Sequence, residues 1–549
     1  MSGMIDRFVH DRMPPGDRWP VMDYGVLPEL AAYPGRLNCG VELLDRMVET
    51  GFSERPVLTY EGAVWRYADL LERSNRIARV LIEDMGVQPG NRVLLRGANT
   101  PTMIACWFAA VKAGAVVVAT MPLLRARELS FILEKAGIDH ALCEESLAGA
   151  LDEAAAASGR RLDVRCFTAL GDGDASLDRA MTAKPSDFDA FDSDATDPAL
   201  IAFTSGTTGE AKGTVHFHRD LLAVCDTYAA HINRLGPDDI VCGSPPLAFT
   251  FGLGGLVLFP MRVGASTALA QNVSPEGLLA LIERQGATCL YTAPTAYRAM
   301  LGKLDAYDIG SLKTCVSAGE HLPIATWQAW RDATGVAICD GIGATEMLHI
   351  FISARGGDIR PGSTGKIVPG YEARIVDAEG APLPPGEPGW LSVRGPTGCR
   401  YLDNPARQAA YVRDGWNITG DIFRQDEDGY FWYVARGDDM IISSGYNIAG
   451  PEVENCLLTH PDIAECAVVG APDPERGHVV AAFVVLRDGV AETPETGEAL
   501  QAYVKSEIAP YKYPRIIRFV DALPKTPTGK LQRFRLRDSL SDRKAGETS

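Results

Sequence analysis

The stretch Thr204-Ser-Gly-Thr-Thr-Gly-Glu-Ala-Lys-Gly213 contains the residue types that hold phosphate groups. Glycines allow the backbone to come close to a ligand, and successive backbone N–H groups in such a loop form a concave site for an anion. Hydroxyl groups donate hydrogen bonds to phosphate oxygens, and Lys212 adds a positive charge on a flexible side chain. Clusters of this composition are usually plain surface turns, so the prediction of a phosphate loop needs support from the rest of the chain.

The common P-loop of GTPases and Walker-type ATPases matches this stretch poorly. That motif has Gly directly before the lysine and Ser or Thr directly after it. Here Ala211 precedes Lys212, and Gly213 follows it. The sequence therefore disfavours both of these enzyme classes.

The elements that would position the loop are short apolar runs, each too short for a helix. The run Pro198–Phe203 leads directly into the phosphate loop. Four later apolar runs are also followed by small, polar or aromatic residues. Each run, together with the residues that follow it, occupies one of the ranges 238–255, 288–295, 314–320 and 336–347. Open α/β sheets bind their ligands at the carboxyl ends of strands, so we expect these ends to form one site.

The wider pattern predicts three kinds of structure. Residues 56–200 alternate apolar runs with helical patterns, which is typical of layered α/β structure with mostly parallel strands. An acidic, polar segment at 171–197 is expected to be a surface connection. From about residue 362 the pattern becomes all-β, and residues 439–549 resemble a small α/β module.

We therefore expect an α/β protein with a large multi-sheet N-terminal domain and a small α+β C-terminal domain. The large domain would comprise two layered α/β subdomains and a β-rich subdomain. The predicted boundary lies at Gly437-Asp438, where small and acidic residues separate two differently patterned regions. This boundary gives domains 1–437 and 438–549.

Composition restricts the functions open to the chain. At 549 residues it is too long for one hydrophobic core, and its net charge of −18 disfavours binding to nucleic acid or to anionic membranes. Its 12 cysteines form no C-x-x-C pair, which favours a reduced, cytoplasmic setting. We expect no secretory signal in the charged N-terminus, and Lys112 and Gly114 interrupt the nearest candidate for a membrane span.

Three further motifs are each weak evidence for a function, but together they are strong evidence. They are Thr419-Gly-Asp421, Tyr433-x-x-Arg436-x-Asp-Asp439 and Pro524-Lys-Thr-Pro-Thr-Gly-Lys530. With the phosphate loop, their order and spacing resemble those of the adenylate-forming (AMP-binding) superfamily over about residues 40–535. Ala211 stands where that family usually has Pro, which should change the stiffness of the loop more than its charge.

The resemblance implies an ATP-dependent acid-CoA ligase. Such an enzyme forms an acyl-adenylate and pyrophosphate, then an acyl-CoA thioester and AMP, with ATP, Mg²⁺ and coenzyme A as its cofactor and co-substrates. It also implies roles for named residues. The β and γ phosphates of ATP would be held by Thr204, Ser205, Gly206, Thr207, Thr208, Gly209 and Lys212.

The remaining nucleotide contacts follow from the same resemblance. Gly319 and Glu320 would border the adenine, with Asp340 nearby. Thr345 would contact the α-phosphate and Glu346 would bind magnesium, since a carboxylate near a triphosphate repels it unless a divalent cation lies between them. The ribose would be held by Asp421 and Arg436.

The C-terminal domain is expected to move between two half-reactions. Lys530 would join the carboxylate to the α-phosphate, because two anions must meet and the developing charge needs a cation. The resemblance implies that the domain then swings about the hinge residue Asp438 and brings the Gly445 loop towards a tunnel for the pantetheine arm of CoA.

The strand ends without phosphate contacts should line the acid pocket. They supply small, flat and apolar surfaces suited to a planar ring: Ala248, Phe249, Phe251, Gly254, Ala293, Ala318, Gly343, His349 and Ile350. The strings 247–254 and 340–352 look most like aryl-CoA ligases of the benzoate type. With residues 11–15 and 36–44, they look closest to 2-aminobenzoate-CoA ligases. The expected acid is 2-aminobenzoate first and benzoate second, and His349 would face an ortho amino group.

Other interpretations of the substrate, the acceptor and the activity stay open at this point. The acid could be alicyclic or a differently substituted aryl acid, and the acceptor could be a carrier protein supplied in trans. A luciferase-like oxidation or a non-enzymatic nucleotide binder is disfavoured, because a binder has no need of Lys530. The expected partners are small molecules, with no nucleic acid and no membrane, and a homodimer is left open.

Overall fold

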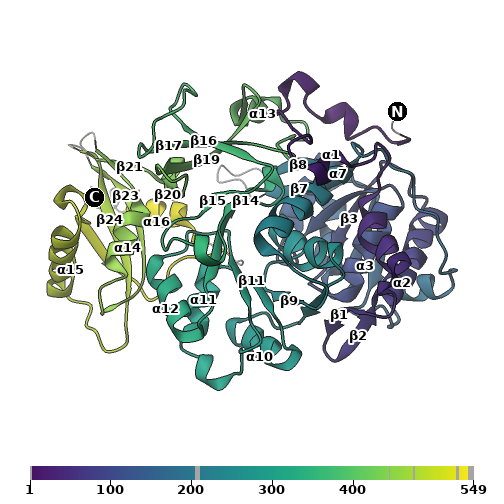
Figure 1. The fold of residues 1–549 in the computed structure, drawn as a ribbon, viewed down its shortest axis with the longest axis horizontal. Coiled ribbons are helices and arrows are strands. Elements are labelled where there is room, and N and C mark those ends of the chain that lie inside the picture. The colour runs from purple at the N-terminus through teal and green to yellow at the C-terminus, as the bar shows by residue number, and fades with distance from the viewer. Residues whose placement is uncertain (1–2, 205–210, 444–445, 474–475, 527–530, 542–549) are drawn as a thin grey trace.

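The computed structural model describes residues 3–204, 211–443, 446–473, 476–526 and 531–541. Within these ranges the strands form four sheets, of nine, six, five and five strands. Figure 1 shows the N-terminal two thirds of the chain as a broad layered body, with the yellow-green C-terminal elements gathered at one end. None of the described helices is long and apolar enough to cross a membrane.

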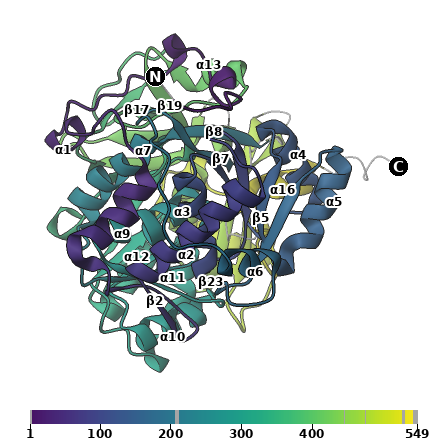
Figure 2. The ribbon, with the colours of Figure 1, turned by 90° about the vertical axis from the view of Figure 1, so that its right-hand side faces the viewer.

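The six-stranded sheet has the order β6-β5-β3-β4-β7-β8, and its strands run parallel except for β8, which pairs antiparallel with β7. Its strands are β3 (Arg92–Arg96), β4 (Val116–Thr120), β5 (His140–Glu144), β6 (Asp163–Phe167), β7 (Pro198–Thr204) and β8 (Lys212–Phe217). Helices α4 (Ala126–Ala136) and α5 (Ala148–Ser158) pack on one face of this sheet, as Figure 2 shows.

The nine-stranded sheet has the order β15-β14-β13-β12-β11-β9-β10-β1-β2, with a parallel centre and antiparallel edges. Its strands are β1 (Pro56–Tyr60), β2 (Ala63–Arg66), β9 (Ile240–Gly243), β10 (Ser266–Leu269), β11 (Cys289–Thr292), β12 (Thr314–Ser317), β13 (Ile338–Gly343), β14 (Ile350–Ser353) and β15 (Lys366–Ile367). Its outer face is covered by α10 (Pro275–Gln285), α11 (Pro294–Leu301) and α12 (Ile324–Thr334).

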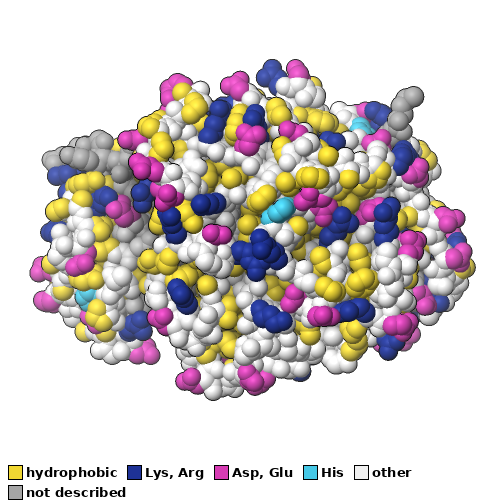
Figure 3. Space-filling view, in the orientation of Figure 1, with side chains coloured by type: hydrophobic (Ala, Val, Ile, Leu, Met, Phe, Trp, Pro, Cys, Tyr) yellow, Lys and Arg dark blue, Asp and Glu magenta, His cyan; other side chains and the backbone are white. Residues whose placement is uncertain are grey.

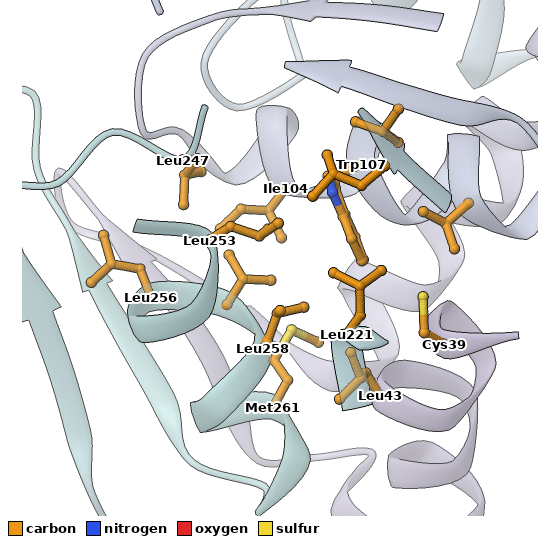
Figure 4. Close-up of a cluster of buried hydrophobic side chains, with 14 of the residues drawn as sticks. Cys39, Leu43, Ile104, Trp107, Leu221, Leu247, Leu253, Leu256, Leu258 and Met261 are labelled. Atoms are coloured by element: carbon orange, nitrogen blue, oxygen red, sulfur yellow. The ribbon is translucent and has the colours of Figure 1, made fainter. Parts of the chain in front are cut away.

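The largest core lies between these two sheets. It includes the buried faces of α2 (Tyr67–Arg79), α3 (Pro101–Lys112), α7 (His218–Val224), α8 (Thr250–Leu253) and α9 (Phe259–Arg262). Figure 4 shows part of it, where Trp107 of α3 packs among leucines of the 247–258 segment. Every residue of α3 is buried, because this helix is surrounded by the two layers. The core therefore fixes the 247–258 segment against the body of the protein.

The third sheet is antiparallel and lies in the region from about residue 362 onwards that was expected to be all-β. Its strands are β16 (Glu372–Val376), β17 (Gly389–Arg394), β18 (Val412–Arg413), β19 (Trp416–Gln425) and β20 (Phe431–Arg436). Helix α13 (Pro405–Tyr411) interrupts this region. Strands β19 and β20 pair antiparallel and form a hairpin around Glu427-Asp-Gly429.

The last sheet belongs to the small C-terminal module. It contains β21 (Ile441–Ser443), β22 (Tyr446–Ile448), β23 (Ile463–Asp473), β24 (Gly477–Leu486) and β25 (Ile516–Phe519). Helices α14 (Gly450–Leu457) and α15 (Pro494–Glu507) pack on one face, and α16 (Arg533–Ser541) packs on the other. The predicted fold class is confirmed, and the boundary at residues 437 and 438 stays a prediction.

One expectation was wrong in part. Segment 171–197 is not only a surface connection, because it contains α6 (Ser176–Thr182). Leu177 and Met181 of this helix are buried in the main core. The acidic composition of the segment concealed these two apolar residues, which stand four positions apart on one face of the helix.

Candidate active site

The described ends of the phosphate loop face each other across two paired strands. Thr204 at the end of β7 is the register partner of Lys212 at the start of β8. Both residues are half-buried. The other residues predicted to hold the β and γ phosphates lie outside the described residues: Ser205, Gly206, Thr207, Thr208 and Gly209.

Lys212 lies among other charged groups. Burial lowers its pKa, and the guanidinium groups of Arg407 and Arg436 lower it further, while the Glu346 carboxylate acts in the opposite direction. Lys212, Glu346 and Arg436, which are all predicted to contact ATP or its magnesium ion, are therefore electrostatically coupled. Basic side chains also gather near the centre of the face shown in Figure 3, although the net charge of the chain is −18. A local positive potential of this kind would attract a triphosphate against the overall charge.

Thr345 and Glu346 lie in a short 3-10 turn, Thr345–Met347, just after β13. The carbonyl oxygen of Thr345 accepts a hydrogen bond of 2.8 Å from Nε2 of His216. The hydroxyl group of Tyr401 donates a hydrogen bond to Oε1 of Glu346. Burial lowers the pKa of His216 to about 4, so its imidazole is neutral near pH 7. The turn is therefore held from two sides.

Sequence reasoning missed His216, Tyr401 and Arg407. His216 and Tyr401 act on residues that are 129 and 55 positions away, so no local spacing connects them to the site. One signal was available, because Lys212 and His216 are four residues apart in a strand and so share a face.

The donor set around Glu346 fits a nucleotide-bound Mg²⁺. Among the described residues, no group of three or more His, Cys, Asp or Glu side chains could hold a metal ion by itself. Magnesium is usually bound through one or two carboxylates together with substrate phosphates. A single carboxylate that is electrostatically coupled to Lys212 at the phosphate loop meets that requirement.

The predicted adenine contacts lie at the ends of β12 and β13. Ser317 and Asp340 are register partners there, and Gly319 adopts a left-handed conformation (φ 88°) that favours glycine. Glu320, the next residue, is half-buried. Burial raises the pKa of Asp340 to about 8. The Asp340 carboxyl group can therefore stay protonated at neutral pH in the free protein.

The predicted ribose contacts are register partners in the β-rich sheet. Asp421 of β19 pairs with Arg436 of β20, and Oδ1 of Asp421 lies 3.5 Å from Nη1 of Arg436. Tyr433 belongs to the same pair of strands, and its ring stacks on His321 with 5.2 Å between centroids. Because His321 directly follows Glu320, this stacking connects the ribose and adenine contacts.

The C-terminal module contacts the same region. Nδ2 of Asn455 in α14 lies 3.2 Å from Nε2 of His321. Burial lowers the pKa of His321 to about 4, so the ring is neutral and can accept this hydrogen bond. A second contact is an ion pair of 3.0 Å between Arg298 of α11 and Glu465 of β23. The module is therefore packed against the nucleotide side of the large domain.

The predicted acid pocket is built around His349. Its ring lies against three aromatic rings, with centroid distances of 4.5 Å to Phe259, 5.3 Å to Tyr228 and 5.7 Å to Phe251. Burial lowers the pKa of His349 to about 3, which makes the imidazole neutral. A neutral imidazole offers one donor and one acceptor to a polar group nearby.

Two glycines bring the backbone close to His349, Gly254 at its ring and Gly343 at its main chain. A Cβ atom on Gly254 would lie 2.4 Å from Cδ2 of His349, and one on Gly343 would lie 2.7 Å from the carbonyl oxygen of His349. Any larger residue at either position would push His349 away. The other predicted pocket residues lie at neighbouring strand and helix ends: Ala248, Phe249, Ala293, Ala318 and Ile350. Phe249 and Phe251 are half-buried, so they can line a path from the surface.

Three predicted residues of the C-terminal region remain untested. Lys530 and Gly445 lie outside the described residues. The predicted hinge, Asp438, lies in the 3-10 turn Gly437–Asp439 that follows β20. Three residues after Lys530, Arg533 forms a half-buried ion pair with Glu454, with Nη2 2.6 Å from Oε1. This pair anchors the start of α16 directly after the segment that carries Lys530.

Family models identify the class of protein that this fold and site define. The AMP-binding enzyme family matches residues 46–400, and the C-terminal domain of AMP-binding enzymes matches residues 452–530. The first match covers more than half of the 549 residues. The chain therefore belongs to the AMP-binding enzyme family.

Individual relatives narrow the class. The chain is 36% identical to a benzoate-CoA ligase of Thauera aromatica, over 94% of this chain and 99% of the relative. Among solved structures, it superimposes with a TM-score of 0.89 and 33% identity on the anthranilate CoA ligase AuaEII in complex with anthranoyl-AMP, covering 94% of this chain and 99% of that one. A benzoate CoA ligase from Burkholderia xenovorans LB400 gives a TM-score of 0.83 at 33% identity, covering 91% and 100%.

These matches confirm two predictions. The chain belongs to the aryl-CoA ligase branch of its family. It is an enzyme of the AMP-forming acyl-CoA ligase class.

Proposed function

We propose that the protein ligates an aromatic acid to coenzyme A, with 2-aminobenzoate as the preferred acid and benzoate as the second. The observation that carries this proposal is the neutral, buried His349 ring enclosed by Tyr228, Phe251 and Phe259. Such a pocket offers flat apolar walls to a benzene ring and a hydrogen-bonding imidazole to a substituent. The relative solved with anthranoyl-AMP, the adenylate of 2-aminobenzoate, supports the choice of acid.

In the first half-reaction, a carboxylate oxygen of the acid attacks the α-phosphorus of ATP, and the bond to the β-phosphate oxygen breaks to release pyrophosphate. Lys212 would neutralise the β and γ phosphates, and Thr345 would lie at the α-phosphate. Asp421 and Arg436 would fix the ribose, so that only the α-phosphorus faces the acid. Lys530 would approach both reacting groups and stabilise the charge that develops between them.

A magnesium ion on Glu346 would neutralise phosphate charge when Mg·ATP is bound. The residues of this chain then have a limited task, which is to align two anionic reactants and to exclude water. The buried end of β12 and the packed C-terminal module suit this task. Desolvation around the reacting groups strengthens each of these electrostatic contacts.

In the second half-reaction, the thiolate of CoA attacks the carbonyl carbon of the acyl-adenylate, and AMP leaves. Rotation of residues 438–549 about Asp438 would remove Lys530 and bring the Gly445 loop to the site. The contacts of Asn455 with His321 and of Glu465 with Arg298 would have to break in this rotation. Both contacts are polar, so the rotation is compatible with the packing of the module.

Pyrophosphate release across a panel of acids tests the proposal. The panel should contain 2-aminobenzoate, benzoate, 3-hydroxybenzoate, cyclohexanecarboxylate and octanoate, each with and without CoA. We expect the highest kcat/KM for 2-aminobenzoate, followed by benzoate, and sustained turnover only with CoA. A preference for the alicyclic or straight-chain acid would contradict the proposal, and sustained turnover only with a carrier protein would identify the alternative acceptor.

Three related expectations also stay predictions. Magnesium should be required for pyrophosphate release. A homodimer is open to a measurement of molar mass in solution, and the cytoplasmic location is open to a fractionation experiment. None of these outcomes alters the choice of acid.

A further inference from the structure

Glu346 is held by a residue far away in the sequence. The hydroxyl group of Tyr401 donates a hydrogen bond to Oε1 of Glu346, and Tyr401 is 1% exposed. An ionised carboxylate can only accept hydrogen bonds, so the phenol is the donor in this contact. A carboxylate with one oxygen held in this way has a fixed orientation for its other oxygen.

Tyr401 is itself fixed to the strand that begins with Lys212. The backbone N–H of Val215 donates to the carbonyl of Arg400 at 2.9 Å, and that of Leu402 donates to the carbonyl of Gly213 at 2.8 Å. Between these two bonds, Thr214 and Tyr401 form an isolated β-bridge. The position of the phenol is thus defined relative to β8.

Helix α13 secures the backbone around Tyr401. Oε1 of Gln408 accepts a hydrogen bond of 2.9 Å from the Tyr401 N–H, and Nε2 of Gln408 donates to the carbonyl of Cys399 at 3.0 Å. The ring of Tyr411 packs edge-on against the Tyr401 ring, with 5.8 Å between centroids. These contacts restrict Tyr401 without touching Glu346.

The other end of the turn is held by the same strand. His216 of β8 lies 2.8 Å from the Thr345 carbonyl oxygen, and since that oxygen can only accept, Nε2 must carry the proton. Behind His216, the buried carboxylate of Asp220 pairs with Arg400. The Arg400 guanidinium also donates to the Val215 carbonyl at 3.2 Å. One buried network therefore joins both contacts to β8.

We propose that Tyr401 and His216 are positioning residues that hold the Thr345–Glu346 turn in register with Lys212. Tyr401 orients the Glu346 carboxylate for a divalent cation on ATP, and His216 fixes the backbone of Thr345. The inference rests on the proposed function, in which Glu346 binds that cation. It goes further because it assigns the orientation of the carboxylate to a hydroxyl group on another element.

The test compares Tyr401→Phe with Tyr411→Phe. Each variant removes one buried hydroxyl group from neighbouring rings, but only the first removes the bond to Glu346. The measurement is the binding of Mn²⁺ in the presence of α,β-methylene-ATP, followed by the electron paramagnetic resonance signal of free Mn²⁺. Removal of a group that orients a metal ligand typically weakens metal binding 10- to 100-fold, so we expect about a 10-fold loss for Tyr401→Phe and none for Tyr411→Phe.

The His216 contact has its own pair of variants. His216→Gln keeps an N–H donor near the position of Nε2, whereas His216→Leu removes it. We expect the Gln variant to bind Mn²⁺ and nucleotide within about 2-fold of the wild type, and the Leu variant to bind them about 10-fold more weakly. Thermal unfolding of all four variants shows whether any loss comes from unfolding.

The outcomes separate this inference from the proposed function. If Tyr401→Phe binds Mn²⁺ as tightly as the wild type, or if Tyr411→Phe loses as much affinity, the positioning role of Tyr401 is wrong and the ligase assignment is unaffected. If folded wild-type protein shows no nucleotide-dependent Mn²⁺ binding, the assignment of Glu346 fails and this inference fails with it. A selective loss in Tyr401→Phe supports both.

Discussion

Oδ1 of Asp421 lies 3.5 Å from Nη1 of Arg436, and the two residues are register partners on β19 and β20. Asp421 is mostly buried at its side chain, whereas Arg436 is 45% exposed there. This asymmetry suits a carboxylate that accepts hydrogen bonds from a ligand while its basic partner orients it. The pair joins the β-rich sheet to the proposed nucleotide site.

Replacing Asp421 should weaken ATP binding selectively. We expect Asp421→Ala to raise the KM for ATP about 10- to 100-fold, because hydrogen bonds to a charged group contribute roughly 1.5–3 kcal/mol, while the KM for the acid changes little. Initial rates of pyrophosphate release at varied ATP give this value. Glu372→Ala is the matched control, since Glu372 pairs with Arg394 across the same sheet and is more exposed. A comparable effect in the control would remove the ribose assignment.

Asp340 should make stability depend on pH. Its pKa is raised to about 8 in the folded protein, against 3.8 for an ordinary Asp, so the folded state holds one more proton than the unfolded state between these values. The free energy of unfolding should therefore fall as the pH rises from about 4 to about 8, and this contribution should level off above that. Urea unfolding of wild type and Asp340→Asn at several pH values measures the difference.

The Asn variant cannot titrate at this position, so its free energy of unfolding should lack the part of the decline with pH that Asp340 causes. Other groups titrate in both proteins and cancel in the comparison. Parallel curves for the two proteins between pH 5 and pH 8 would mean that Asp340 is ionised in the folded state. Its surroundings would then be more polar than the described contacts indicate.

The buried ion pair of Lys112 and Asp45 should stabilise the fold without affecting catalysis. Nζ of Lys112 lies 2.6 Å from Oδ1 of Asp45, and the Lys112 side chain has no exposed surface. Removing one partner of a buried pair typically costs 3–5 kcal/mol, so Lys112→Met should lose about 3 kcal/mol in urea unfolding. Lys303→Met, which breaks the exposed pair with Glu276, should change stability by less than about 1 kcal/mol.

Activity per folded molecule should be unchanged in both lysine variants, because neither residue lies at the proposed site. Equal stability losses in the two would contradict the role of burial. A drop in kcat for folded Lys112→Met would show that α3 transmits strain to the 247–258 segment that packs on it.

His349 should decide between 2-aminobenzoate and benzoate. We expect His349→Ala to reduce the preference for 2-aminobenzoate about 10-fold in kcat/KM, because the ring nitrogen proposed to contact the ortho substituent is lost. Competition between the two acids, with product ratios from chromatography, measures the preference directly. His231→Ala is the control, since His231 is on the surface beside Glu29. An unchanged ratio in His349→Ala would exclude contact with the amino group.

The sheets could be predicted because their strands carry local signals. The runs that became β9, β11, β12 and β13 are short, apolar and followed by small or polar residues, and the structure places their ends along one edge. Strand length and side-chain pattern depend on neighbours in the sequence, so a sequence contains that information. The helix α6 was hidden because its two buried residues stand within an acidic segment.

The contacts that position the site could not be predicted in the same way. Tyr401 meets Glu346, and His216 meets Thr345, only because β8 and residues 399–402 pair in the folded chain. Such pairing depends on tertiary structure and leaves no periodic trace. The roles of Lys530 and Gly445 rest on resemblance to the family, and both residues lie outside the described ranges.

The central claim is that the protein joins an aromatic acid to AMP and then to CoA. It is tested most directly by mass spectrometry of reactions quenched after one turnover, with enzyme in excess over 2-aminobenzoate and ATP. Without CoA we predict 2-aminobenzoyl-AMP and an equal amount of pyrophosphate; with CoA we predict 2-aminobenzoyl-CoA and AMP. Formation of ADP and phosphate would contradict the account. So would a CoA thioester in the reaction with CoA if the reaction without CoA yields no adenylate.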